Sequence, residues 1–460
     1  MLSHMLGRVS KITAERWKVT DANGNVTYPL KEQGYAMNDV IGTGGLEAAY
    51  ESVLRGTDGE VKITLDSSGV ITEESVTVAA QPGLTVMTTI DTDFQKKVQQ
   101  HLEEAILKLQ RNYGETNGGK ANAGAVVVLD VKDNSVLAAC NYPTYDLNGN
   151  YNDYLADTAA TPLLNRAFGG LYTPGSTFKP ATTLAALLSG NATAAEKIKC
   201  TGTYNYYTGY PPRCAGGSGH TGSYLDAADA LKYSCNIYFY EVGRRTTSEV
   251  YNKYAKQLGL ATKTGLEVYE ETGQLTTKND PGYTASLDIQ AAIGQGNTAV
   301  TPVQLATYAS TIANKGVRYR THLVKALVDT NTGEMVQETA PVVEEIIEDN
   351  IGAFAAIEEG MVRAGANTSR VNTYPYTIAI KTGSPQRHES YMLGSTKKYY
   401  TNTMMIAYGP VEDPQIAVAI VIEYGGGGAR AAELLTQIFD AYFFEQSGSM
   451  TAAGENTLLE

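Results

Sequence analysis

Long apolar segments are missing from this sequence. Its longest uninterrupted aliphatic run, Ile416–Ile422, spans about seven residues, whereas a helix needs roughly 20 apolar residues to cross a bilayer. The N-terminus also lacks the charged and then apolar stretches of a signal peptide. Residues 1–5 read Met-Leu-Ser-His-Met, which resembles a vector remnant. We therefore expect a truncated chain from which a native N-terminal anchor has been removed.

Clusters of basic residues are absent as well. The chain has 36 Lys and Arg against 49 Asp and Glu, a formal net charge of −13. Nucleic acids and anionic membrane surfaces are bound by clustered Lys and Arg, so this charge argues against both as partners.

Cysteine and histidine are scarce, at four and five residues. Cys140, Cys200, Cys214 and Cys235 form no CxxC pair, and no HExxH occurs, so we expect no metal and no cofactor. Cys200 and Cys214 flank a Tyr- and Gly-rich loop and could form a disulfide, but two free thiols are an equally good interpretation. We interpret Cys235 as a small buried apolar residue and His220 as a loop residue that makes hydrogen bonds.

The sequence does contain enough hydrophobic residues to form a large core. With 460 residues, 43% of them hydrophobic, the chain can form two or three domains. Residues 1–85 read as short alternating strands separated by turns, with one helix over 45–54, and predict a small supporting module. Residues 86–447 predict the main domain, and residues 448–460 a polar tail.

The main domain combines strands from two distant parts of the chain. A helix over 94–109 and a hairpin turning at Asp133-Asn134 come first. Strands over 376–380, 403–408 and 416–424 follow much later, and a helix over 429–444 closes the domain. Strands in two blocks with helices between them predict an α+β fold with an antiparallel sheet.

The stretch around Ser176 is the first candidate for chemistry. Pro174-Gly175 predicts a turn, and residues 181–188 continue as an apolar helix. Ser176 and Lys179 lie three residues apart and share a face of the first turn, so the amine can reach the hydroxyl. This arrangement predicts a serine nucleophile with a lysine base, near the positive end of a helix dipole. A capped helix with an exposed lysine is the alternative.

Two further patterns follow in chain order, Ser234-Cys235-Asn236 and Lys381-Thr382-Gly383. One S-x-x-K is expected by chance in a chain of about this length, so context must separate candidates from accidental matches. Lys381 follows directly on a predicted strand. The accidental matches lie in a polar loop or at helix ends: Ser395 with Lys398, Ser189-Gly190-Asn191 and Lys263-Thr264-Gly265.

The three motifs in this order resemble those of the class B penicillin-binding proteins, the serine D,D-transpeptidases of bacterial cell-wall synthesis. The resemblance covers about residues 40–445 and implies a β-lactamase/transpeptidase-like domain, with an antiparallel sheet between helices on both sides, preceded by a small β-rich pedestal. Further stretches resemble the same family: residues 42–47, Leu54-Arg55-Gly56, Thr89-Ile90-Asp91, residues 172–179, Gly294-Gln295-Gly296 and residues 301–306.

The resemblance implies a role for each motif residue. Ser176 would attack the carbonyl between two D-alanines of a stem peptide and form an acyl-enzyme. Lys179 would be the base, its pKa lowered by burial and by the nearby Lys381 cation. Ser234 would relay the proton to the leaving amine, and Asn236 would hold the substrate amide.

The same resemblance assigns the third motif to substrate binding. Lys381, Thr382, Gly383 and Ser384 would bind the terminal carboxylate, and the backbone N–H groups of Ser176 and Ser384 would form the oxyanion hole. Pro385 departs from the family pattern, but it lies beyond the proposed N–H donor.

The resemblance also implies partners and a location. D-Ala-D-Ala stem peptides, β-lactam antibiotics and a partner glycosyltransferase in the membrane are the expected partners. The chain would act at the extracytoplasmic face of the bacterial cell membrane. A D,D-carboxypeptidase or β-lactamase-like hydrolase and a non-catalytic β-lactam sensor or scaffold are the alternative functions.

Overall fold

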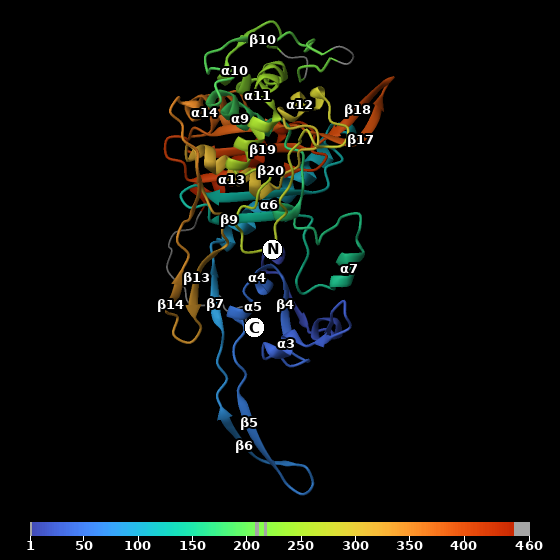
Figure 1. The fold of residues 1–460 in the computed structure, drawn as a ribbon, viewed down its shortest axis with the longest axis vertical. Helices are drawn as coiled ribbons and strands as arrows, with labels where there is room; N and C mark the ends of the chain where they lie inside the picture. Colours follow the sequence, from blue (N-terminus) through green and yellow to red (C-terminus); the bar gives the residue numbers. More distant parts are fainter. Residues whose placement is uncertain (1, 208–210, 216–218, 446–460) are drawn as a thin grey trace.

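A five-stranded antiparallel sheet forms the centre of the molecule. The computed structural model describes residues 2–207, 211–215 and 219–445 (Figure 1). The strand order is β16-β19-β20-β8-β9, which brings both ends of the main domain into one sheet. Strands β19 and β20 are buried along their whole length, which is why they read as continuous apolar runs. The strands are β8 (Gly124–Asp130), β9 (Val136–Tyr142), β16 (Ala379–Gly383), β19 (Thr403–Gly409) and β20 (Ile416–Ile422).

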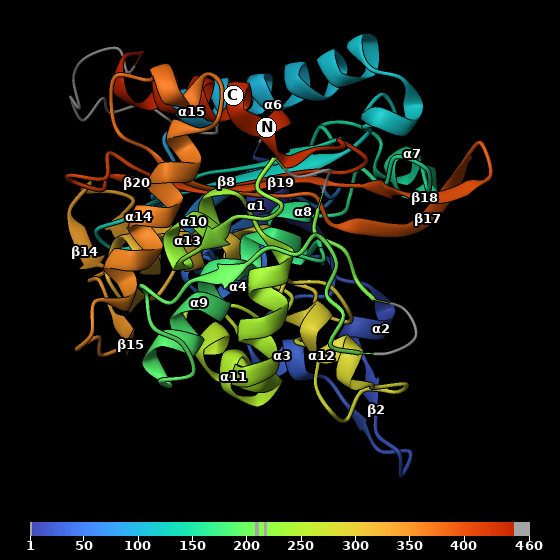
Figure 2. The same cartoon turned by 90° about the horizontal axis from the view of Figure 1, so that it is seen from above.

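Helices cover both faces of this sheet, as Figure 2 shows. Alternate residues of β8 divide between two cores: Val127 packs in one and Val126 in the other. The predicted α+β fold with helices on both sides is therefore confirmed. One face is covered by α6 (Thr92–Asn112) and α15 (Ala432–Phe443), and the other by α9 (Lys179–Leu188), α11 (Asn236–Gln257) and α13 (Pro302–Ala313).

Shorter elements surround the centre. The ribbon of β17 (Gln386–Leu393) and β18 (Thr396–Thr401) projects from one end of the sheet (Figure 1). The other elements of this region are α7 (Tyr151–Ala156), α8 (Arg166–Gly169), β10 (Ile198–Lys199), β11 (Tyr224–Leu225), α10 (Ala227–Lys232), α12 (Ala285–Ala291), β12 (Val317–Tyr319), β15 (Val343–Ile346) and α14 (Ala353–Ala366).

The N-terminal region extends away from the sheet as an elongated support (Figure 1). Its far end is an exposed ribbon of β5 (Glu60–Leu65) and β6 (Ile71–Val78). Strand β7 (Leu84–Thr88) pairs with β13 (Val324–Asp329), which pairs with β14 (Met335–Glu338). The predicted boundary near residue 85 thus falls within a strand that pairs with a much later segment. The predicted tail over 448–460 lies outside the described residues.

Two local predictions differ from the structure. The helix expected over 45–54 is two short helices, α4 (Gly45–Ala49) and α5 (Glu51–Leu54). The strand expected over 376–380 begins only at Ala379 and includes the whole Lys381 motif. Tyr376 instead packs against the aromatic end of α15, and its ring centroid lies 5.2 Å from that of Phe443.

Residues 2–5, interpreted above as part of a vector remnant, contact the rest of the molecule. Helix α1 (Ser3–Leu6) packs into the molecule, and Met5 is only 3% exposed. The Ser3 hydroxyl donates a hydrogen bond to the Tyr145 carbonyl at 2.6 Å, and the Tyr145 hydroxyl donates one back to the Ser3 carbonyl at 3.0 Å. Residues 2–5 thus pack into the fold, and their interpretation as a vector remnant stays a prediction. None of the helices in the described ranges combines the length and apolarity that crossing a membrane requires.

Candidate active site

Ser176 lies in a 3₁₀ turn, Gly175–Phe178, that leads directly into α9. Gly175 has φ +55°, a conformation that glycine adopts without steric cost. A Cβ at this position would lie 3.1 Å from the Pro385 side chain, so the glycine also lets the turn approach the end of β16. Pro180 fits into the first helical turn, as expected. The turn that carries Ser176 therefore lies against the end of β16, which carries the Lys381 motif.

Lys179 is fully buried, and its amine is held by the second motif. Its Nζ donates to the Ser234 carbonyl at 2.7 Å and to Asn236 Oδ1 at 2.7 Å, and lies 3.1 Å from Ser234 Oγ. Among the described residues, no hydrogen bond joins Lys179 to Ser176. The expected contact along the helix turn is thus replaced by contacts across to the Ser234 segment. Hydrogen bonds of catalytic groups commonly tighten only when substrate is bound.

Ser234 links the two lysines of the site. Its backbone has φ +53°, an uncommon left-handed conformation for a residue with a side chain. Its Oγ lies 3.1 Å from Lys179 Nζ and 3.0 Å from Lys381 Nζ. A hydroxyl has one proton to donate, so it can donate to a neutral amine while it accepts from an ammonium. This arrangement suits a neutral Lys179 beside a charged Lys381.

Burial disfavours the charged form of both amines. Burial lowers the pKa of Lys179 to about 7, while the nearby thiols Cys235 and Cys214 act in the opposite direction. The pKa of Lys381 is also lowered, first by burial and then by repulsion from Lys179. Two buried amines 3.1 and 3.0 Å from one hydroxyl disfavour each other's charge. At neutral pH the pair can therefore supply one free base.

The third motif occupies the edge strand of the central sheet. Lys381 is 1% exposed, whereas Thr382 is half-buried and Ser384 is exposed. The Ser384 hydroxyl accepts a hydrogen bond from the Gly428 backbone N–H at 2.8 Å. A Cβ on Gly383 would lie 2.9 Å from the Pro174 carbonyl, so the strand end and the Ser176 turn are in direct contact. The structure thus brings all three motifs together.

Asn236 begins helix α11 and faces the same amine. Besides accepting from Lys179, its side-chain amide donates a hydrogen bond to the Arg213 carbonyl at 3.4 Å. The accidental motif matches lie elsewhere. Thr264 is buried and binds the Glu270 carboxylate, and Ser395 lies in the turn of the β17–β18 ribbon.

A cluster of thiols that the sequence analysis missed adjoins the second motif. Cys200, Cys214, His220 and Cys235 each offer a ligand atom, and these four atoms lie within 4.8 Å of one another. Cys214 Sγ lies 3.4 Å from His220 Nε2 and 3.9 Å from Cys235 Sγ. All four cysteines are free, so the structure contains no Cys200–Cys214 disulfide. A hydrogen bond from the Cys235 thiol, together with backbone N–H groups of Asn236 and Ile237, lowers the pKa of Cys214.

This donor set fits a tetrahedral metal ion. Three thiols and an imidazole are a common ligand set of structural zinc, and with bonds of about 2.3 Å its ligand atoms lie about 3.8 Å apart. The expectation of no metal stays a prediction, and this cluster is the place where it can be tested. Regular spacing did not reveal the cluster, because its four residues come from separate loops and from the middle of the Ser234-Cys235-Asn236 motif. Three of the four cysteines and a histidine within 36 residues were the available signal.

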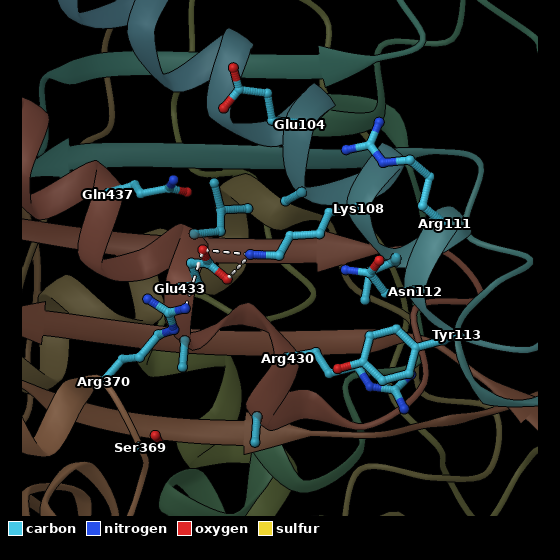
Figure 3. A pocket seen from close by; sticks show the side chains of 15 residues that line it. Glu104, Lys108, Arg111, Asn112, Tyr113, Ser369, Arg370, Arg430, Glu433 and Gln437 are labelled. Atoms are coloured by element: carbon cyan, nitrogen blue, oxygen red, sulfur yellow. Dashed lines mark hydrogen bonds and ion pairs between the residues drawn. The ribbon is translucent and has the colours of Figure 1, made fainter.

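Two cavities of the described chain have no motif residue in their lining. The larger, about 780 Å³, lies between α6 and α15, and no motif residue lines it (Figure 3). In this cavity the Glu433 carboxylate forms ion pairs with Lys108 at 2.7 Å and with Arg370 at 3.4 Å. The other, about 540 Å³, is lined by Tyr172, Thr173 and residues 386–389, which directly flank the Ser176 turn and the Lys381 strand.

Comparison with known proteins is consistent with this geometry. The family model of the penicillin binding protein transpeptidase domain matches residues 124–440, and that of the penicillin-binding protein dimerisation domain matches residues 1–88. Peptidoglycan D,D-transpeptidase MrdA of Haemophilus influenzae is 30% identical over 475 residues, covering 96% of this chain and 68% of the relative.

Two solved structures share the fold. A chain of a peptidoglycan synthase complex that coordinates polymerization and crosslinking has a TM-score of 0.77 and 28% identity, covering 94% of this chain and 74% of that chain. Penicillin-binding protein A of Mycobacterium tuberculosis, as an imipenem acyl-enzyme complex, has a TM-score of 0.64 and 27% identity, covering 78% and 80%.

Proposed function

This chain belongs to the penicillin-binding protein transpeptidases, and from that premise we propose that it is a serine D,D-transpeptidase that cross-links peptidoglycan stem peptides through an acyl-enzyme on Ser176. The observation that carries the proposal is the bridge of Ser234 between two buried lysines, beside the Ser176 turn. Such a pair supplies a neutral amine as base and a cation to guide an anionic substrate.

The proposed reaction gives each of these groups a role. Ser176 Oγ attacks the carbonyl carbon between the two D-alanines, and Lys179 accepts the hydroxyl proton. The resulting oxyanion is stabilised by the backbone N–H groups of Ser176 and Ser384. As the C–N bond breaks, Ser234 relays the proton to the nitrogen of the departing D-alanine. An amine of a second stem peptide then attacks the ester, which forms the cross-link and regenerates Ser176.

Substrate binding is assigned to the groups around this path. The ammonium of Lys381 and the hydroxyls of Thr382 and Ser384 bind the terminal carboxylate, and Gly383 lets the strand lie against the Ser176 turn. Asn236 binds the amide of the stem peptide. Pro385 lacks an N–H, but the proposed donor is the preceding residue. A β-lactam would acylate Ser176 in the same way, as imipenem acylates the mycobacterial neighbour.

If the cluster of Cys200, Cys214, His220 and Cys235 holds zinc, the ion would anchor the loop that carries Cys214 and His220 to the start of α11. Its role there would be structural, because four protein ligands leave no open position for substrate.

Location and partners are inferred from the family. We place the chain at the extracytoplasmic face of the bacterial cell membrane, with residues 1–85 as a pedestal and residues 86–447 as the transpeptidase domain. A glycosyltransferase in the membrane is the proposed partner, supported by the neighbour that belongs to a peptidoglycan synthase complex.

The test is acylation by a β-lactam followed by intact-mass measurement and peptide mapping. We expect one persistent adduct, located on Ser176 and absent from Ser176→Ala. An adduct elsewhere would overturn the site. Rapid hydrolysis of the drug would instead favour a β-lactamase-like hydrolase, and full cellular function of Ser176→Ala would favour a scaffold.

A further inference from the structure

The larger cavity, of about 780 Å³, lies between α6 and α15 (Figure 3). These helices cover the face of the central sheet opposite α9, which the Ser176 turn leads into (Figure 2). Ala105, Ala429 and Ala432 line the cavity, and their short side chains leave room between the helices. The proposed reaction gives this cavity no role.

Positive charge predominates in the lining. The four cations are Lys108, Arg111, Arg370 and Arg430, and the two carboxylates are Glu104 and Glu433. In a chain with a formal net charge of −13, this excess of cations is a local exception. It favours a ligand that carries negative charge.

The cations are compensated unequally. The Glu433 carboxylate accepts from Lys108 Nζ at 2.7 Å and lies 3.4 Å from Arg370 Nη2, so one anion is shared by two cations. Arg430 is held by neutral oxygens instead, and its Nη2 donates to Asn117 Oδ1 at 2.7 Å. Such hydrogen bonds fix the guanidinium of Arg430 but leave its charge uncompensated.

Arg111 retains its full capacity to bind a ligand. Among the residues that the structure describes, none accepts a hydrogen bond from its guanidinium or forms an ion pair with it. Arg111 follows Lys108 by three residues and therefore lies one turn further along the same face of α6. Figure 3 shows Arg111 and Arg430 toward one end of the cavity and Arg370 toward the other.

The backbone of Arg370 is strained. This residue, which precedes the 3₁₀ turn η3 (Val371–Thr373), has φ +73°, an uncommon conformation for a residue with a side chain. Strained residues of this kind cluster at ligand-binding sites, where the surrounding structure holds them in place. The strain is a second observation that points to a ligand in this cavity.

Neutral polar side chains complete the lining. Within the described ranges, no side-chain hydrogen bond involves Asn112, Ser369 or Gln437. A side-chain amide offers both a donor and an acceptor, which suits the N–H and C=O groups of a peptide backbone. The lining residues of α6 extend from Glu104 to Asn112, which is about 12 Å along the helix. An extended peptide covers this length with about four residues.

The spacing of the cations indicates where such a peptide carries its carboxylates. Lys108 and Arg111 are separated by about 4.5 Å along the axis of α6. In an extended peptide, side chains two residues apart project from the same side and lie about 6.6 Å apart. The long side chains of lysine and arginine can span this small difference. Carboxylates at alternate residues would therefore meet both ends of the cavity.

We propose that this cavity binds an extended acidic segment of another protein, with one carboxylate bound by Arg111 and Arg430 and a second, two residues away, bound by Arg370. The guanidinium fork matches the two oxygens of a carboxylate, so Asp and Glu are the side chains that fit. The inference goes beyond the proposed function, because it requires nothing of the chemistry at Ser176.

The first experiment titrates peptides with blocked termini into the full chain by calorimetry at low salt. The probe is Ala-Glu-Ala-Glu-Ala. Its controls are Ala-Ala-Glu-Glu-Ala, which has the same charge but projects its two carboxylates from opposite sides, and Ala-Gln-Ala-Gln-Ala. We expect the dissociation constant of the probe to be roughly five- to tenfold lower than that of the adjacent-Glu peptide, with no measurable binding of the Gln peptide. Equal dissociation constants for the two acidic peptides would overturn the inference.

Variants then test the cation that has no partner. Arg111→Gln should raise the dissociation constant of the probe by roughly five- to tenfold. Lys96→Gln is the matched control, because Lys96 is an exposed cation of the same helix that does not line the cavity. This control should stay within about twofold of the unmodified chain. An equal loss in Lys96→Gln would mean that only net charge matters and would overturn the inference.

Other occupants give different results. Displacement of the probe by an equal concentration of inorganic phosphate would indicate a site for small anions and overturn the inference. Self-association of the chain in sedimentation velocity, abolished by Arg111→Gln, would indicate a second copy and overturn it as well. Acylation by a β-lactam should be unchanged in Arg111→Gln, because the cavity and Ser176 lie on opposite sides of the sheet. Loss of acylation in this variant would contradict that separation, whereas failure of the unmodified chain to be acylated would contradict the proposed function instead.

Discussion

Two buried clusters share the Ser234-Cys235-Asn236 turn, and the charges that their groups can carry have opposite signs. The side chains of Ser234 and Asn236 contact the amines of Lys179 and Lys381, whereas the side chain of Cys235 contacts the Cys214 thiol. The first cluster holds two groups that become cations, and the second holds three that become anions.

The two clusters resolve their charges differently. In the amine cluster burial lowers the pKa of both lysines, which favours a neutral base. In the thiol cluster a metal cation could instead balance thiolates, because three thiols and an imidazole surround one point. Cys235, the middle residue of the S-x-N motif, therefore lies in the candidate metal site, while its neighbours Ser234 and Asn236 contact the amines of the proposed catalytic site.

Removing the base should have the largest effect. Lys179→Met keeps the length of the side chain but cannot accept the Ser176 proton, so we expect acylation by a β-lactam to slow by roughly 10²- to 10⁴-fold. Stopped-flow acylation with a fluorescent penicillin measures this rate, and circular dichroism checks that the variant is folded. A folded variant acylated at the original rate would show that another group is the base.

Metal removal tests the second cluster. We expect one zinc ion per chain, and zinc at 1,000 times its dissociation constant would stabilise the folded state by about 4 kcal/mol. Elemental analysis and thermal unfolding with and without a chelator measure both quantities. Cys235→Ser should lose the metal, and Cys140→Ser is the control because Cys140 is buried outside the cluster. Chelation without any effect on unfolding would contradict the assignment.

The rate of acylation should rise with pH. Burial lowers the pKa of Lys179 to about 7, and only the neutral amine is a base. The rate should therefore rise about tenfold per pH unit below this value and level off above it. A profile that is flat from pH 5.5 to 9 would contradict the role of Lys179.

Lys179 also makes the free energy of unfolding depend on pH. An unfolded lysine has a pKa of about 10.4, so between about pH 7 and 10.4 the unfolded chain binds more protons at Lys179 than the folded chain does. Its contribution to the free energy of unfolding therefore rises with pH across this window. Urea unfolding at several pH values, compared with Lys179→Met, isolates this contribution.

The smallest expected effect concerns the backbone of the shared turn. Ser234→Ala and Ser234→Gly both remove the hydroxyl, but only glycine adopts φ +53° without strain. We expect the glycine variant to be more stable by about 0.5 to 1 kcal/mol, after allowing for its greater freedom in the unfolded chain. Urea unfolding of the two variants measures the difference, and equal stability would show that the turn is not strained.

Local patterns predicted the secondary structure well where burial and periodicity agree. The helix expected over 94–109 is present as α6, and the hairpin around Asp133-Asn134 is present as β8 and β9. The start of β16 was displaced, because aromatic packing of Tyr376 on α15 overrides its strand propensity.

The candidate site was predicted in part. Chain order and context separated Ser176, Ser234 and Lys381 from accidental matches such as Ser395. Sequence spacing placed the Lys179 amine at Ser176, whereas the structure shows it bound across to Ser234 and Asn236. A hydrogen bond between segments 55 residues apart is invisible to helical periodicity.

The sequence by itself determined the elements and the chemistry that each motif carries, because turns, helix faces and strands depend on neighbouring residues. Only the tertiary structure decided which groups meet. It joined Ser234 to two amines and gathered three thiols with His220. These contacts depend on how the sheet and the helices bury polar groups from distant segments together, which no local pattern specifies.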